Sequence, residues 1–194
     1  KKWEDKAYDW QIQGATVLAA AGRGFLGDER GMGKSLSSFI WRQLTESKRT
    51  LVLTRKQYVP NFVKQIQLWE PEIPVLDLTG MTAKQREFTL QFSSKMYDNF
   101  MVVTNFESWR RNGKVVDELV AAQFDSVILD EAHNLKNFAS VTTKGFLEIA
   151  AAVEKCLIMT GTPMQNRPQE LFTILHALYP NLFPNESSYL SDYC

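Results

Sequence analysis

Cysteine is scarce in this chain of 194 residues, and long apolar runs are missing from it. Its two cysteines are Cys156, which lies in an apolar stretch, and Cys194, the last residue. Their spacing predicts neither a disulfide framework nor a metal site, and this favours a reducing, intracellular setting such as cytoplasm, nucleoid or nucleus. No apolar run is long enough to span a bilayer, and the first residues do not resemble a signal peptide. These absences argue against a membrane-embedded or a disulfide-stapled protein.

An excess charge of either sign is also missing. Lys and Arg together number 22, as do Asp and Glu, so any nucleic-acid-binding surface has to be a local patch. Hydrophobic residues make up 44% of the chain, which predicts a globular fold with a full core. Without repeats or a clear linker, we expect one domain over residues 1–194. Because the first residue is not Met, we expect an excised or processed piece.

Hydrophobic patterning predicts an α/β fold with a mostly parallel sheet, because short buried stretches alternate with stretches of helical periodicity. Helix starts are indicated by Asp9 as an N-cap, by Thr82 with Gln85 as a capping box, and by Pro168 in a first turn. We expect strands at 25–27, 51–54, 75–78, 100–104, 127–130 and 156–160, and helices at 10–20, 34–45, after 60, after 82, at 114–123 and after 168.

Residues 31–35 read G-M-G-K-S and lie between an expected strand and an expected helix. Glycines let backbone N–H groups approach phosphate oxygens, and the N-terminus of the following helix adds a positive dipole. Lys34 would reach the β- and γ-phosphates, and the Ser35 hydroxyl would hold Mg²⁺. Because Asp28 stands where the eight-residue pattern begins with Gly, a plain glycine-rich turn is the alternative.

The apolar strand expected over 127–130 ends in two acids, Asp130 and Glu131. The carboxyl ends of parallel strands form the edge of a sheet where ligands bind. Asp130 would hold Mg²⁺ directly or through water, and Glu131 would polarise an attacking water. Taken alone, the two acids can equally be a solvated strand end. Together with Lys34 and Ser35 they predict one magnesium–triphosphate site.

Four segments resemble the Swi/Snf-type translocases of superfamily 2. Residues 28–35 (D-E-R-G-M-G-K-S) resemble that family's D-E-x-G-x-G-K-T, and residues 130–137 (D-E-A-H-N-L-K-N) its D-E-A-H-x-L-K-N. Residues 160–166 (T-G-T-P-M-Q-N) are similar to T-G-T-P-x-Q-N, and residues 10–14 (W-Q-I-Q-G) to Y-Q-x-x-G. The resemblance covers about residues 8–178 and implies the first RecA-like P-loop lobe of an ATPase, with helices on both faces of the sheet.

The resemblance implies a role for each matched position. Lys34, Asp130 and Glu131 would be catalytic, and Ser35 and Asp130 would hold Mg²⁺. Gln11 would contact the adenine of ATP, and the phosphates would lie against Asp28, Gly31, Met32, Gly33, Lys34 and Ser35. The γ-phosphate would be coupled to the nucleic-acid groove and to a second lobe through His133, Thr160, Gly161, Thr162 and Pro163.

Two segments that face nucleic acid in the family differ in this chain. Arg55 stands where a Pro is usual, and residues 104–107 read T-N-F-E in place of T-x-Y-E. The candidates for nucleic-acid contacts are Arg55, Lys56, Lys64, Thr104, Arg110 and Arg111. Ordinary solvated surface residues are the alternative for each. Trp69 and Trp109 are expected to pack in the core rather than to stack on bases.

No motif of a second RecA-like lobe follows residue 166. Such a lobe supplies arginine fingers worth ~10³–10⁵ in rate, so we expect weak nucleotide binding and negligible hydrolysis from this chain alone. The parent protein is expected to couple ATP hydrolysis to movement along double-stranded DNA, without a membrane and without forming an oligomer. Two alternatives stay open: a strand-separating helicase or restriction-system motor, and a non-catalytic nucleotide-sensing scaffold.

Overall fold

A single parallel sheet organises the computed structural model, which describes residues 3–109, 113–135, 137–162 and 169–194. Within these residues the strands follow the order β1-β6-β5-β2-β4-β3. Their bounds are β1 (Arg23–Leu26), β2 (Arg49–Thr54), β3 (Val75–Asp77), β4 (Phe100–Asn105), β5 (Ser126–Asp130) and β6 (Lys155–Met159). β2, β4, β5 and β6 are covered on both faces, which explains why their sequences are nearly continuous apolar runs.

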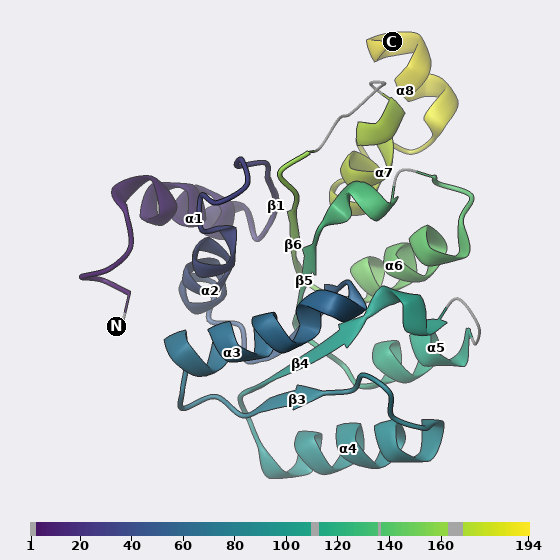
Figure 1. Cartoon of the computed structure of the whole chain (residues 1–194). Coiled ribbons are helices and arrows are strands. Elements are labelled where there is room, and N and C mark those ends of the chain that lie inside the picture. The colour runs from purple at the N-terminus through teal and green to yellow at the C-terminus, as the bar shows by residue number, and fades with distance from the viewer. Residues whose placement is uncertain (1–2, 110–112, 136, 163–168) are drawn as a thin grey trace.

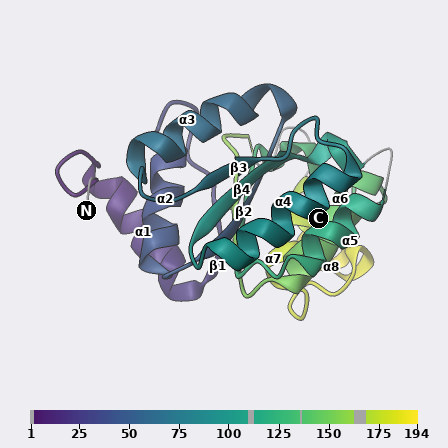
Figure 2. The same ribbon diagram turned by 90° about the horizontal axis from the view of Figure 1, so that it is seen from below.

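Helices cover both faces of the sheet (Figures 1 and 2). One face carries α1 (Asp9–Ala21), α2 (Lys34–Leu44) and α3 (Val59–Trp69), and the other carries α4 (Ala83–Met96), α5 (Lys114–Ala121), α6 (Val141–Ala152) and α7 (Gln169–Leu178). Successive strand residues alternate between the two cores: Val52 packs with the first set and Leu53 with the second. The fold class predicted from the sequence is confirmed.

Short elements complete the chain. Three 3₁₀ turns, η1 (Lys56–Tyr58), η2 (Phe106–Trp109) and η3 (Ala132–Leu135), follow β2, β4 and β5, and α8 (Glu186–Tyr193) packs on α7. Trp109 is buried, and Trp69 packs at the edge of the first core, as predicted. Among the described residues, no helix has both the length and the apolar character that crossing a membrane requires.

The structure corrects several local predictions. The N-cap of α1 is Tyr8 rather than Asp9, because Tyr8 is extended and its N–H donates to the side chain of Gln11 at 3.0 Å. Two helices were not predicted: α6, whose start contains β-branched residues and a Gly, and α8, which is short and polar. The Thr82 capping box is confirmed. Pro168 lies outside the described residues.

Strand order decides which loops meet at the carboxyl edge of the sheet. β6 lies between β1 and β5, so the residues after β6 lie between the loop that follows β1 and the acids that end β5. On its other side β5 pairs with β2, and Leu53 is opposite Leu129. Thr54 is therefore the neighbour of Asp130.

Arg23 anchors the opposite end of β1. Its guanidinium donates to the carbonyl oxygens of Ala150 and Val153 at 2.9 Å each, and to those of Ala177 and Leu178 at 2.9 and 3.1 Å. These carbonyls lie at the C-terminal ends of α6 and α7, where a cation also complements the helix dipole. One side chain thus ties two helices to the sheet.

Candidate functional site

The loop after β1 has the shape of a phosphate cradle. Gly31 and Gly33 have φ of 86° and 76°, a region that other residues rarely adopt, and Gly33 caps the N-terminus of α2. The ammonium of Lys34 donates to the backbone carbonyls of Asp28 and Glu29 at 2.8 Å each. Lys34 therefore lies inside the loop, where phosphate oxygens would replace these carbonyls.

Gln11 connects helix α1 to this loop. Its side chain is buried, its Nε2 donates to the carbonyls of Met32 at 3.0 Å and Gly33 at 3.3 Å, and its Oε1 accepts from the Tyr8 N–H. A Cβ on Gly33 would lie 2.2 Å from this Nε2. Gln11 thus supports the cradle directly, and its predicted adenine contact stays a prediction.

Asp130 and Glu131 stand at the carboxyl end of β5. The Thr54 hydroxyl donates to Asp130 Oδ2 at 3.1 Å, and the Glu131 backbone N–H also donates to the Asp130 carboxylate. Burial raises the pKa of Asp130 to about 6, although these hydrogen bonds and the charge of Lys34 act to lower it. Glu131 has φ of 59°, so the chain turns sharply after the strand.

The phosphate loop and the acidic strand end share one cavity of about 520 Å³. Lys34, Ser35, Asp130 and Glu131 all line it, together with Gln11, Gly31 and Gly33. The predicted convergence of these residues is confirmed. A hydroxyl and a carboxylate are hard oxygen donors of the kind Mg²⁺ accepts, and Mg²⁺ usually keeps several waters. Among the described residues, no group of three or more His, Cys, Asp or Glu is placed to hold a metal.

The segment after β6 contacts the phosphate loop. The Thr160 N–H donates to the Leu26 carbonyl at 3.2 Å, and the Thr160 hydroxyl accepts from the Thr162 N–H at 3.2 Å. A Cβ on Gly161 would lie 3.2 Å from the backbone N of Arg30. A shift of the phosphate loop would therefore reach residues 160–162. Pro163 and the side chain of His133 lie outside the described residues, and the backbone of His133 belongs to η3.

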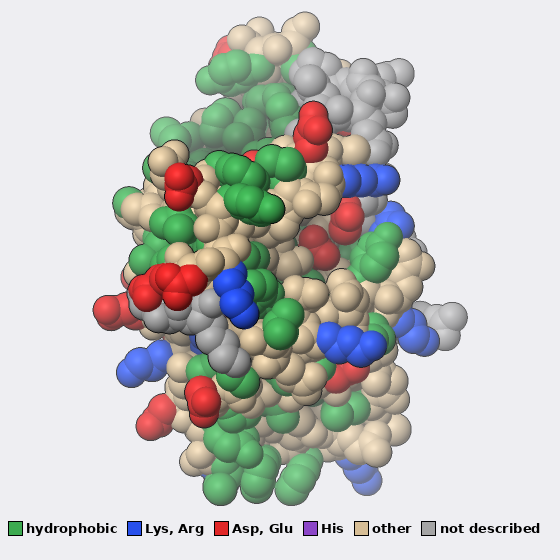
Figure 3. Space-filling view, turned by 60° about the vertical axis from the view of Figure 1, so that its left-hand side comes forward, with side chains coloured by type: hydrophobic (Ala, Val, Ile, Leu, Met, Phe, Trp, Pro, Cys, Tyr) green, Lys and Arg blue, Asp and Glu red, His purple; other side chains and the backbone are tan. Residues whose placement is uncertain are grey.

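Of the described candidates for nucleic-acid contacts, Arg55, Lys56 and Thr104 lie near the carboxyl ends of the neighbouring strands β2 and β4, and Lys64 lies on α3. Arg55 follows β2 and is half-buried, while Lys56 and Lys64 are exposed on η1 and α3. Thr104 is buried within β4, so its hydroxyl presents no surface to a ligand in this conformation. Arg110 and Arg111 lie outside the described residues. Figure 3 shows basic and acidic side chains interspersed over the face it displays, in agreement with a net charge of zero.

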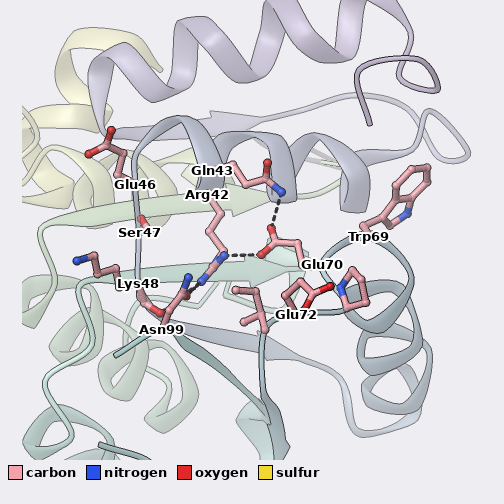
Figure 4. Close-up of a pocket in the computed structure, with 11 residues that line it drawn as sticks. Arg42, Gln43, Glu46, Ser47, Lys48, Trp69, Glu70, Glu72 and Asn99 are labelled. Carbon is pink, nitrogen blue, oxygen red and sulfur yellow. Dashed lines mark hydrogen bonds and ion pairs between the residues drawn. The ribbon is translucent and has the colours of Figure 1, made fainter. Parts of the chain in front are cut away.

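A larger cavity, of about 620 Å³, lies at the opposite, amino-terminal edge of the sheet (Figure 4). Its wall contains the buried ion pair of Arg42 with Glu70, and Arg42 also donates to Asn99 and, at 2.9 Å, to the Thr50 hydroxyl. Burial lowers the pKa of Arg42 and raises that of Glu70. These charges are already satisfied by protein groups, so we place the functional site at the smaller cavity.

Sequence reasoning missed part of the candidate site. Thr54 was expected only as a strand residue, and its contact with Asp130 depends on β2 and β5 being neighbours, which the sequence pattern does not specify. A further part of the cavity wall comes from Tyr58 of η1 and from Asn61, Gln65 and Trp69 of α3. Amphipathic periodicity predicted that helix without indicating which polar residues would face a ligand.

Comparisons with known proteins agree with this geometry. The model of the SNF2-related domain matches residues 10–193. The human DNA repair and recombination protein RAD54B is 31% identical over 87% of the chain, and the probable ATP-dependent DNA helicase CHR23 of Arabidopsis thaliana is 29% identical over 82%. The chain spans 19% and 15% of these relatives. The Sulfolobus solfataricus SWI2/SNF2 ATPase core, solved with double-stranded DNA, matches 97% of the chain with a TM-score of 0.80, at 20% identity and over 39% of its own length.

Proposed function

Because this chain belongs to the SNF2-related domain family, we propose that residues 1–194 form the ATP-binding, RecA-like lobe of a DNA-dependent ATPase that moves along double-stranded DNA. The observation that carries the proposal is the cavity in which Lys34, Ser35, Asp130 and Glu131 meet. A scaffold that only kept the fold has no need of all four groups.

Each group has a distinct chemical task in this proposal. The Lys34 ammonium exchanges the carbonyls of Asp28 and Glu29 for phosphate oxygens and offsets their charge. The Ser35 hydroxyl and the Asp130 carboxylate would hold Mg²⁺, which would supply positive charge to offset that of the phosphates. Glu131 orients and polarises the attacking water. The Gln11 side chain, placed beside the loop, is proposed to contact adenine.

Residues 160–162 would carry the state of the nucleotide away from the cavity. They bond to the end of β1 at Leu26 and lie beside the phosphate loop at Arg30, and they follow the strand that lies between the loop and Asp130. We propose that a second RecA-like lobe completes the motor and supplies arginine fingers. Closure of the two lobes on ATP and reopening after hydrolysis would then step the protein along DNA.

The test is ATP turnover by the parent protein with and without double-stranded DNA, for the wild type, Lys34→Ala and Glu131→Gln. We expect DNA to stimulate the wild type and both variants to lose turnover by at least about 10²-fold. Unchanged turnover in both variants would overturn the mechanism. Triplex displacement without strand displacement supports translocation on duplex DNA, whereas efficient strand separation would favour a helicase.

A further inference from the structure

Thr54 brings a buried hydroxyl to the carboxylate that the proposed function assigns to Mg²⁺. It is the last residue of β2 and is fully buried, and its Oγ1 donates to Asp130 Oδ2 at 3.1 Å. Residues 51–53, which precede Thr54 in β2, are aliphatic. A Val at position 54 would therefore suit the strand and its packing as well as Thr does. The hydroxyl therefore needs an explanation beyond packing.

The contact fixes an orientation that the Asp130 side chain would not hold by itself. The terminal torsion of an aspartate is broad, so the plane of a free carboxylate is poorly defined. The β-branched Thr54 has a stiff χ1 torsion, and its strand is paired with β4 and β5 on either side. A rigid donor aimed at Oδ2 favours one carboxylate plane.

We propose that Thr54 is a positioning residue for metal binding, whose hydroxyl holds the Asp130 carboxylate in the plane that receives Mg²⁺ of a magnesium–nucleotide. The inference rests on the proposed function, because it needs Asp130 to be a metal ligand. It assigns Thr54 no contact with nucleotide. Removing the Thr54 hydroxyl should therefore reduce the gain in nucleotide affinity that the metal provides, and leave metal-free nucleotide binding unchanged.

Matched variants of one strand provide the test. Thr54→Val removes the hydroxyl and keeps the shape, and Thr54→Ser restores the hydroxyl. Thr50→Val is the control: Thr50 is equally buried, lies at the other end of β2, and its hydroxyl bonds Ser126 Oγ of the same neighbouring strand at 2.8 Å. Calorimetry would give the ADP affinity of each chain with excess EDTA and with Mg²⁺. Electron paramagnetic resonance would give Mn²⁺ binding in the presence of ADP.

For Thr54→Val we expect Mn²⁺ binding to the chain–ADP complex to weaken by roughly 10–100-fold, the usual effect of removing a group that orients a metal ligand. ADP affinity in EDTA should stay unchanged, Thr54→Ser should recover most of the metal binding, and Thr50→Val should lower only the unfolding free energy. If Thr54→Val shows no cooperative unfolding, Thr54→Ala carries the same comparison.

The remaining outcomes would contradict either the role of Thr54 or the proposed function. Equal Mn²⁺ binding by wild type and Thr54→Val would refute the role of Thr54 while leaving the proposed function intact. Equal losses in Thr54→Val and Thr50→Val would mean that the effect is general destabilisation, which also refutes it. No metal-dependent ADP binding by the wild type would refute the proposed function itself, and the inference with it.

Discussion

Replacing Asp130 by Asn should make the ligand-free chain more stable at neutral pH, although it should remove metal binding. Burial raises the pKa of Asp130 from 3.8 to about 6 in the folded chain, so the folded state holds this proton more tightly than the unfolded state does. The stabilisation from the protonated form is complete below pH 3.8 and is lost as the pH rises through about 6.

The size of the effect follows from this shift. At pH 7.5 the ionisation of Asp130 lowers the unfolding free energy by about 3 kcal/mol relative to the fully protonated form, and at pH 5 by about half as much. Asn mimics the protonated carboxyl and keeps an oxygen for the Thr54 hydroxyl, but it has one carbonyl oxygen for the two donors that face Asp130. We therefore take about 3 kcal/mol as the upper bound of the gain at pH 7.5, and expect at least about 1 kcal/mol.

Urea denaturation without Mg²⁺ or nucleotide, at pH 5 and pH 7.5, measures the difference. Asp77→Asn is the control: Asp77 is exposed at the end of β3, and its replacement should change stability by no more than about 0.5 kcal/mol at either pH. An Asp130→Asn chain that is no more stable than wild type at pH 7.5, or a gain that does not shrink toward pH 5, would refute the reasoning.

Three further predictions concern the cradle and the guanidinium groups of Arg23 and Arg42. Gly33→Ala should weaken ATP binding more than Gly31→Ala in calorimetric titration, because both glycines have positive φ but only a Cβ at Gly33 would meet the Gln11 amide; equal effects would remove Gln11 from the cradle. Arg23→Met should lower the unfolding free energy by about 2–4 kcal/mol, because carbonyls at the ends of α6 and α7 lose their donor; wild-type stability in urea would contradict this. Glu70→Leu should lower the unfolding free energy by about 3–5 kcal/mol, because the Arg42 charge stays buried without its partner. Adding Arg42→Met should recover most of that loss, and additive losses in a double-mutant cycle would argue against a buried ion pair.

The sequence predicted what depends on local pattern. The buried runs at 51–54, 100–104 and 127–130 could only be interior strands, and each lies within two residues of its observed bounds. Residues 31–35 and the acids at 130 and 131 were recognisable because phosphate and metal chemistry constrain both residue type and spacing. Their convergence followed from the rule that ligands bind at the carboxyl edge of a parallel sheet.

Features that depend on non-local geometry could not be read from the sequence. The contact of Thr54 with Asp130 requires β2 beside β5, and four of the backbone carbonyls that accept from Arg23 lie at the ends of two helices far along the chain. Helix α6 begins V-T-T-K-G, a poor local helix sequence, and it forms because Phe146 and Ile149 are buried in the core. Tertiary packing decided these features.

The most direct test of the account is calorimetric titration of the chain with Mg-ATP, for wild type, Lys34→Ala and the exposed-surface control Lys64→Ala. We expect one Mg-ATP bound per chain by wild type and Lys64→Ala, with at least about tenfold weaker binding by Lys34→Ala. Wild type that binds no Mg-ATP, or Lys34→Ala that binds it as tightly as wild type, would contradict the claim that Lys34 and the acids of β5 share one magnesium–nucleotide.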